Sequence, residues 1–213
     1  VALCALMLLP LSANATPLAQ SLKQHGLQPI DPPSAAADFD LPTLAGSQIK
    51  LSDTQGRWVL LTFFATWCGP CMAEMPSLIR FQELHHKRGV DVLAISGDTT
   101  VAPVHQLARE KNINFPILLD PQGRVAGQYR ASSIPVSYLI NPEGLLIAVA
   151  RGARDWSSMG RLVDTLLSTE PAMDSPSGSY QAGNAPIELP EVLNPPTATV
   201  LEPTTPPQPG VPF

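Results

Sequence analysis

The sequence predicts a three-layer α/β domain, in which a central mixed β-sheet has helices on both faces and an N-terminal β-hairpin precedes it. The apolar run 58–65 lacks polar alternation, which is typical of a strand covered on both faces. Strand and helix patterns then alternate as far as residue 119, and this order favours parallel strands joined by helical crossovers. Residues 136–149 add two strands joined by a short turn, which pair antiparallel. The sheet is therefore expected to be mixed.

The first part of the domain holds the hairpin and the first helix. Residues 40–46 and 48–51 read as a short hairpin closed at Gly46. The strand 58–65 follows, and a helical pattern then runs from Pro70 to about Lys87, with a kink expected at Pro76 and an end at Gly89. Its expected apolar stripe consists of Met75, Leu78, Ile79, Gln82 and Leu84.

The second part repeats the strand and helix pattern and then turns back. We expect a strand at 90–96, a helix at 101–112 with Leu107 and Ile113 facing inward, and a strand at 117–119. A turn at 120–123 and a short helical piece at 125–129 lead to strands at 136–140 and 145–149. Asp155 is expected to cap a last helix whose inner face carries Met159, Leu162, Val163, Leu166 and Leu167.

Composition divides the chain into four parts. Residues 1–15 are typical of a signal peptide, with a cleavage site after Ala15, and the alternative is a short uncleaved membrane anchor. Residues 16–37 are rich in Pro and Ala and suggest a flexible lead-in. The folded domain is expected at 38–168, and a Pro-rich disordered tail at 169–213.

Charge argues against two classes of partner. The formal net charge is −5, and residues 171–213 carry four acidic residues and no Lys or Arg, so the rest of the chain has a net charge of −1. There is no basic stripe of the kind that binds nucleic acid and no polybasic segment for an anionic membrane surface. We expect neither as a partner.

The candidate reactive site is the segment Trp67-Cys68-Gly69-Pro70-Cys71, which lies where the expected strand ends and the expected helix begins. A thiol in the first turn of a helix lies near unpaired N–H groups and the positive end of the helix dipole, which stabilise its thiolate. A second thiol three residues later can close a disulfide. The alternatives are a buried cysteine pair or half of a zinc site. Zinc requires more ligands, and the spacing of His25, His85, His86 and His105 does not supply them. No metal is expected, and Cys4 receives no role.

These features together resemble the thioredoxin superfamily, and most closely the extracytoplasmic thiol-disulfide oxidoreductases of the TlpA/ResA type. The resemblance covers about residues 38–168. It rests on the hairpin that begins at Asp40-Leu41-Pro42, on residues 67–71, on Glu74 followed by Met75-Pro76, on Ile134-Pro135 before a strand, and on the turn 141–144. It implies a thioredoxin-like fold.

The resemblance also implies roles for individual residues. The peptide bond before Pro135 is expected to be cis and to face the disulfide, and the backbone of Ile134 to pair with an extended substrate segment. Trp67 is expected to shield the cysteine pair and to shape the docking face, and the alternative for it is a role in packing alone. Gly69 and Pro70 would complete the substrate-binding face. Glu74, three residues after Cys71, is expected either to relay a proton to that thiol or to be a solvent-facing carboxylate. Thioredoxin itself has a buried Asp at the position of Thr62.

The expected function is reduction of disulfides in extracytoplasmic proteins, with Cys68 as the exposed attacking thiol and Cys71 as the resolving thiol. No cofactor other than the redox-active disulfide is expected. The resemblance implies a membrane electron donor of the DsbD or CcdA type, and apocytochrome c or a broader set of oxidised proteins as clients. A thiol peroxidase, a Cu(I) chaperone that uses the CxxC thiols, and a disulfide isomerase remain as alternatives.

Overall fold

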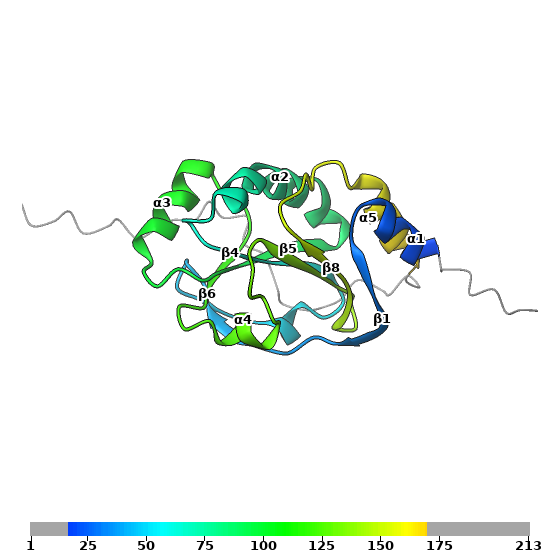
Figure 1. Ribbon diagram of the computed structural model, residues 1–213, viewed down its shortest axis with the longest axis horizontal. Helices are drawn as coiled ribbons and strands as arrows, with labels where there is room; N and C mark the ends of the chain where they lie inside the picture. Colours follow the sequence, from blue (N-terminus) through cyan, green and yellow to red (C-terminus); the bar gives the residue numbers. More distant parts are fainter. Residues whose placement is uncertain (1–16, 170–213) are drawn as a thin grey trace, which may run out of the picture.

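The computed structural model describes residues 17–169 (Figure 1). The expected signal peptide and almost all of the expected tail lie outside the described residues. Within residues 17–169, none of the helices is long and apolar enough to cross a bilayer. The described part forms one sheet covered by helices, together with a separate two-stranded hairpin.

The main sheet has six strands in the order β1-β8-β7-β4-β5-β6, and it is mixed as expected. Pairs β4–β5 and β5–β6 are parallel, and the other pairs are antiparallel. The strands are β1 (Gln28–Ala35), β4 (Trp58–Phe64), β5 (Val90–Ser96), β6 (Ile117–Leu119), β7 (Val136–Ile140) and β8 (Leu145–Arg151). Every residue of β4, β5 and β7 is buried, because both faces of the sheet are covered at its centre.

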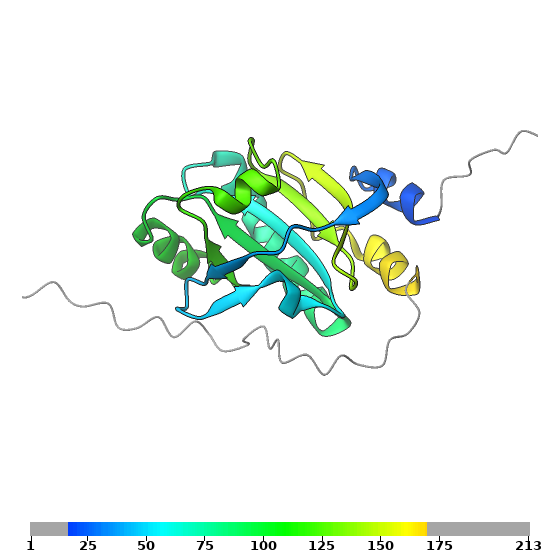
Figure 2. The same ribbon diagram turned by 90° about the horizontal axis from the view of Figure 1, so that it is seen from below.

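Helices cover one face of the sheet, and a mixed layer covers the other (Figures 1 and 2). The first layer contains α1 (Pro17–Gln24), α2 (Gly69–His85), α3 (Ala102–Lys111) and α5 (Gly160–Thr169). The second contains α4 (Arg124–Gln128), the hairpin of β2 (Asp40–Pro42) and β3 (Gln48–Lys50), and the short 3₁₀ helix η1 (Leu51–Thr54). A further 3₁₀ turn, η2 (His86–Arg88), follows α2. Each layer has its own buried apolar cluster against the sheet. This is the expected three-layer α/β class.

Residues 17–35 differ from the flexible lead-in that composition suggested. They form α1, which packs beside α5, and β1, which pairs antiparallel with β8. Leu22 and Leu27 are buried in the helical layer. The register of β1 shifts between Pro29 and Ser34. Proline-rich residues fit an edge strand, since an edge has one side on which missing N–H groups cost nothing.

Two local predictions about helices are wrong. Asp155 does not cap α5, which begins at Gly160; its carboxylate accepts hydrogen bonds from the N–H and hydroxyl of Ser157 in the preceding turn. Leu84 is 41% exposed, and Phe81 instead takes a place on the inner face of α2. The inner face follows the helical spacing of three and four residues from Cys71, and Leu84 is off that path.

Candidate active site

Cys68 and Cys71 form a disulfide at the point where β4 leads into α2, with a Cα–Cα distance of 5.2 Å. Cys68 is the N-cap of α2, and its Sγ accepts a hydrogen bond of 3.2 Å from the backbone N–H of Cys71. Pro70 lies in the first turn, where its missing N–H has no helical partner to lose. When the disulfide is reduced, the backbone N–H of Cys71 and the positive end of the α2 dipole would stabilise a thiolate on Cys68.

The two sulfur-bearing residues are less accessible than expected. In this oxidised state Cys68 is 5% exposed and Cys71 is 2% exposed, so the expectation of an exposed Cys68 does not hold for the disulfide form. The neighbouring residues are open, since Trp67 is 75% exposed and Gly69 and Pro70 are also exposed. A partner protein would therefore meet Trp67, Gly69 and Pro70 first.

The Ile134-Pro135 segment lies against the disulfide. The peptide bond between these residues is cis, as the resemblance implies, and the carbonyl oxygen of Ile134 lies 3.8 Å from the Sγ of Cys68. The antiparallel pairing of β7 with β4 places Val136 beside Phe63 and so brings this segment to the end of β4. Pro135 is buried, and Ile134 is partly exposed.

Glu74 is buried under α2 with an exposed fraction of 3%, so the solvent-facing alternative is wrong. Its Oε1 accepts a hydrogen bond from the indole N–H of Trp156, while Oε2 has no hydrogen-bond partner among the described residues. Burial raises the pKa of Glu74 from 4.5 to about 7, although the Trp156 hydrogen bond and the charge and backbone amide of Arg154 oppose this. A carboxyl group with such a pKa can accept and release a proton near neutral pH.

Sequence reasoning missed Trp156 and Arg154, which lie between β8 and α5. Trp156 is 82 residues from Glu74, and the guanidinium of Arg154 lies 5.5 Å from the centre of the Trp156 ring. Local periodicity carries no signal for a contact at this separation.

Asp98 was also missed. Its carboxylate, on a residue 8% exposed, accepts hydrogen bonds from the backbone N–H and hydroxyl of Thr66 and from the hydroxyl of Ser96. The sequence did contain a signal for Asp98, because it is a polar residue just after the parallel strand β5. The carboxyl ends of parallel strands form the edge of the sheet where α/β proteins place their functional sites. Thr62, at the position of the thioredoxin Asp, is buried and accepts a hydrogen bond from the hydroxyl of Ser137.

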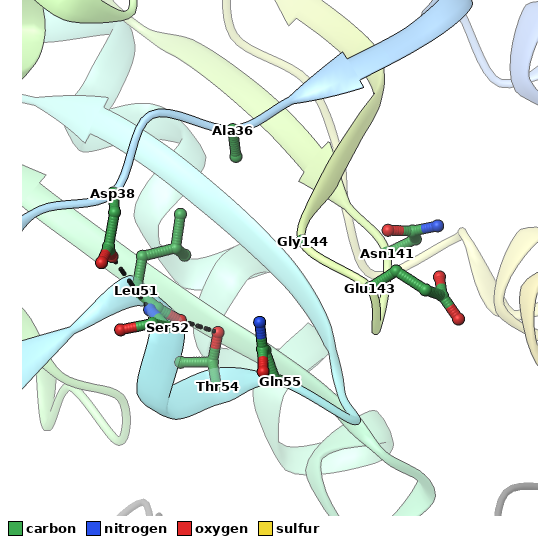
Figure 3. A pocket seen from close by; sticks show the side chains of 9 residues that line it. All are labelled: Ala36, Asp38, Leu51, Ser52, Thr54, Gln55, Asn141, Glu143 and Gly144. Carbon is green, nitrogen blue, oxygen red and sulfur yellow. Dashed lines mark hydrogen bonds between the residues drawn. The ribbon is translucent and has the colours of Figure 1, made fainter.

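A pocket of about 270 Å³ lies elsewhere, around η1 and the β7–β8 turn (Figure 3). Its lining includes Asp38, Ser52, Asn141 and Glu143 and none of the site residues expected from the sequence. Asn141 follows β7, whereas Pro135 precedes it, so the pocket and the disulfide lie at opposite ends of that strand.

Comparison with known proteins agrees with this geometry. The thiol-disulfide oxidoreductase ResA of Bacillus subtilis (strain 168) is 35% identical over 127 residues, which are 60% of this chain and 71% of ResA. Among solved structures, a candidate thiol:disulfide interchange protein DsbE from Chlorobium tepidum has a TM-score of 0.60 and 29% identity, covering 65% of this chain and 99% of that one. StoA from Bacillus subtilis has a TM-score of 0.54 and 25% identity, covering 61% and 98%.

The family model described as the AhpC/TSA family matches residues 32–149, a range that contains both cysteines, Glu74 and the cis Ile134-Pro135 bond. The relationship to the thioredoxin superfamily and to ResA that the sequence motifs implied is therefore confirmed: the chain belongs to the AhpC/TSA family and is a relative of the ResA thiol-disulfide oxidoreductases.

Proposed function

We propose that the protein is an extracytoplasmic thiol-disulfide oxidoreductase that reduces disulfides in partner proteins. One observation carries the proposal: the disulfide of Cys68 and Cys71 lies at the start of α2, directly beside the carbonyl of Ile134. This arrangement offers one sulfur that is stabilised as a thiolate and a second sulfur that can displace a captured partner. ResA relatives are named for the same class of reaction.

The reaction begins with the reduced, dithiol form. The thiolate of Cys68 attacks one sulfur of the partner's disulfide, and the other partner sulfur leaves as a thiolate that takes up a proton. Cys71 then loses its proton and attacks the Sγ of Cys68, which releases the partner's second sulfur. The partner gains two electrons and two protons, and the Cys68–Cys71 disulfide forms. The reaction requires no bound cofactor.

Three surrounding groups would support this exchange. The open residues Trp67, Gly69 and Pro70 would contact the partner, while the backbone of Ile134 next to Pro135 would pair with its extended segment. Glu74, buried three residues after Cys71 on the same helix, would accept the proton of the Cys71 thiol and return it when the disulfide is reduced again.

The location is proposed from the sequence of the N-terminal segment, and the partners from the redox chemistry. We place the protein outside the cytoplasm because residues 1–15 have the pattern of a signal peptide. A reductant in an oxidising compartment has to be reduced again, so a membrane dithiol donor of the DsbD or CcdA type is the proposed electron source. Apocytochrome c before haem attachment is the proposed client, and a broader set of oxidised proteins is the alternative.

The test is a reduction potential together with two cysteine variants. Gly69-Pro70 is also the dipeptide of thioredoxin, so we expect a potential nearer to about −270 mV than to the value of about −120 mV of the oxidant DsbA. C68S should abolish reduction of a protein disulfide, and C71S should accumulate a mixed disulfide between Cys68 and the substrate. A potential near that of DsbA would overturn the reductant assignment, and an active C68S variant would overturn the mechanism.

A thiol peroxidase is the second candidate, because the hairpin that begins at Asp40 is also found in peroxidases of the peroxiredoxin type. Such a site needs a Thr three residues before the thiolate. Thr66 is instead two residues before Cys68, and its hydroxyl donates a hydrogen bond to Asp98. Peroxide consumption by the C71S variant separates the two functions. Tight Cu(I) binding without reductase turnover would instead favour the chaperone alternative, and turnover of scrambled disulfides would favour an isomerase.

A further inference from the structure

We propose that Trp156 is a positioning residue for the carboxyl group of Glu74. Its indole N–H keeps Oε1 as a hydrogen-bond acceptor, so that Oε2 is the oxygen that exchanges a proton with Cys71. Arg154, whose guanidinium lies over the indole, supports this arrangement. This inference rests on the proposed function for its consequence in turnover. Its geometry can be tested without turnover.

The loop that carries Trp156 is attached to α2 at two neighbouring points. The indole N–H of Trp156 donates to Oε1 of Glu74, and its backbone N–H donates to Oγ of Ser77 over 3.2 Å. The Ser77 hydroxyl lies 3.3 Å from the carbonyl oxygen of Arg154 and 2.8 Å from that of Glu74. Helix and loop are therefore tied together within the first two turns after Cys71, which restricts movement of the indole relative to the carboxyl group.

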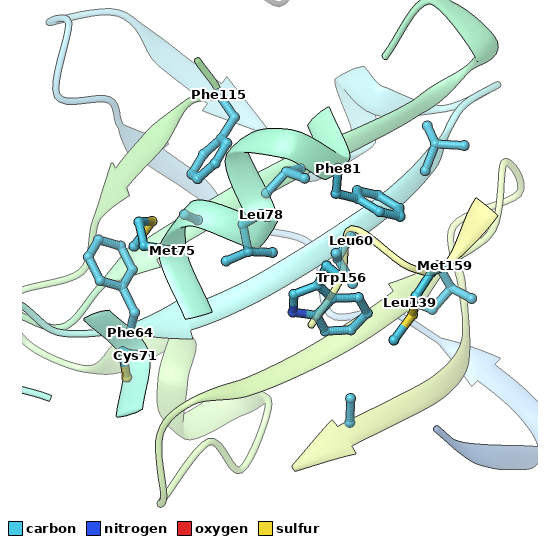
Figure 4. Packing of buried hydrophobic residues seen from close by; sticks show 14 of the residues in the cluster. Leu60, Phe64, Cys71, Met75, Leu78, Phe81, Phe115, Leu139, Trp156 and Met159 are labelled. Carbon is cyan, nitrogen blue, oxygen red and sulfur yellow. The ribbon is translucent and has the colours of Figure 1, made fainter. Parts of the chain in front are cut away.

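Packing fixes the indole ring itself. Trp156 is 1% exposed and lies between α2 and the sheet, with Leu60, Leu78 and Leu139 around it (Figure 4). Phe81 contacts it edge to face with ring centres 6.2 Å apart. A ring held in this way cannot turn its N–H towards water, so Glu74 is the acceptor that remains for it.

The guanidinium of Arg154, a partly exposed residue, lies over the indole, 5.5 Å from the centre of the ring. Its Nη1 donates to the carbonyl oxygen of Gly26 over 2.9 Å, and its Nη2 donates to that of Arg151 over 3.2 Å. These contacts hold the positive charge over the ring and near Glu74, and they connect the turn after α1 to the site. On the elements packed around Glu74, Arg154 is the charged group that acts on the pKa of that carboxyl group.

The two oxygens of Glu74 are therefore unequal. Oε1 accepts the indole N–H in both protonation states, so the proton belongs on Oε2, which has no other partner among the described residues. During resolution, the ionised carboxylate removes the proton of the Cys71 thiol through Oε2, and the resulting thiolate attacks the Sγ of Cys68. The pKa of about 7 at Glu74 is compatible with this exchange, and the Trp156 hydrogen bond, the Arg154 charge and the Arg154 backbone amide all lower it.

The test uses W156F, which keeps an aromatic ring and removes the N–H. The pKa of the Glu74 carboxyl group is measured by NMR titration of ¹³C-labelled glutamate in the oxidised protein, with E74Q identifying the signal. Loss of a hydrogen bond to a carboxylate should raise that pKa by about one unit. W58F is the matched control, because Trp58 is a 2% exposed residue of the same apolar cluster whose Nε1 has no partner in the described part of the chain.

A second variant covers the case in which W156F does not fold. Arg154 is only partly buried, so R154Q should fold and should also raise the Glu74 pKa, while R154K should keep it near the wild-type value. The pH midpoint for reduction of a protein disulfide should rise in W156F and R154Q and stay unchanged in W58F. A Glu74 pKa in W156F equal to that of the wild type overturns the inference. A wild type that shows no turnover, combined with shifted titrations in the variants, overturns the proposed function and leaves the positioning supported.

Discussion

Asp98 accepts two hydrogen bonds from Thr66, one of 3.0 Å from its backbone N–H and one of 2.6 Å from its hydroxyl. Thr66 stands two residues before Cys68, so this contact fixes the end of β4 from which the disulfide segment begins. The N–H of Gly97 adds a bond of 3.0 Å to the carbonyl oxygen of Phe64. The loop after β5 therefore holds the active-site segment from outside the CxxC motif.

Removal of Asp98 should lower stability. Hydrogen bonds to a buried charged group each contribute about 1.5–3 kcal/mol, and D98A leaves the N–H and hydroxyl of Thr66 without their acceptor. We expect a loss of about 2–3 kcal/mol in the free energy of unfolding, measured by urea denaturation of the oxidised protein. D53A is the control, because the exposed Asp53 accepts one long bond of 3.3 Å, from Lys50. Equal losses in the two variants would contradict this role.

Glu74 should make stability depend on pH. Its pKa is raised from 4.5 to about 7 in the folded protein, so the folded state binds the proton more tightly than the unfolded chain. Stability should therefore fall as pH rises from about 4.5 to about 7 and should change no further above that range. The upper limit of the change is about 3.5 kcal/mol, at about 1.4 kcal/mol per unit of pKa.

The measurement compares urea denaturation of the wild type and E74Q, both oxidised, across pH 4 to 8. The difference between their unfolding free energies should change across the window, because the other titrating groups are common to both proteins. A difference that is constant with pH would mean that Glu74 ionises at an ordinary pKa.

Trp67 should matter for protein substrates and little for stability. Its side chain is 75% exposed beside a nearly buried disulfide, so W67A would remove the proposed docking contact without opening the core. We expect about a tenfold loss in the rate of reduction of a protein disulfide, which corresponds to about 1.4 kcal/mol of binding energy. Reduction of a small soluble disulfide should fall much less. L84A, which removes another exposed apolar side chain from the far end of α2, should leave both rates near wild type.

Local sequence patterns predicted most elements of the sheet and of the redox motif, because their causes are local. The apolar run 58–65 and the turn at 141–144 are signals contained within a few residues. The pairing of β1 with β8 was missed because a Pro-rich strand has no recognisable alternation. The contact between Trp156 and Glu74 was missed because it depends on packing across 82 residues. The helix position of Glu74 was predictable, and its burial was not.

The end of the sheet opposite the disulfide provides a prediction about stability alone. Arg57 forms an ion pair with Asp91, which is fully buried, and its Nη2 lies 3.0 Å from Oδ1 of Asp91. His86 contacts the same carboxylate oxygen at 2.5 Å. R57M would leave the Asp91 carboxylate without its Arg partner, and we expect a loss of about 3 kcal/mol in the free energy of unfolding, at the lower end of the range for broken buried pairs because the His86 contact remains.

The double variant R57M/D91M separates the cost of a lone buried charge from the value of the pair. It removes both charges and should recover most of the stability lost in R57M, because apolar side chains of similar volume often replace a buried ion pair without loss. The disulfide lies beyond the opposite end of β4, roughly 20 Å away at about 3.3 Å per residue, so the rate of disulfide reduction should not change in either variant. Urea denaturation of the wild type, R57M and R57M/D91M measures the three unfolding free energies. A double variant as unstable as R57M would mean that the ion pair itself stabilises the fold.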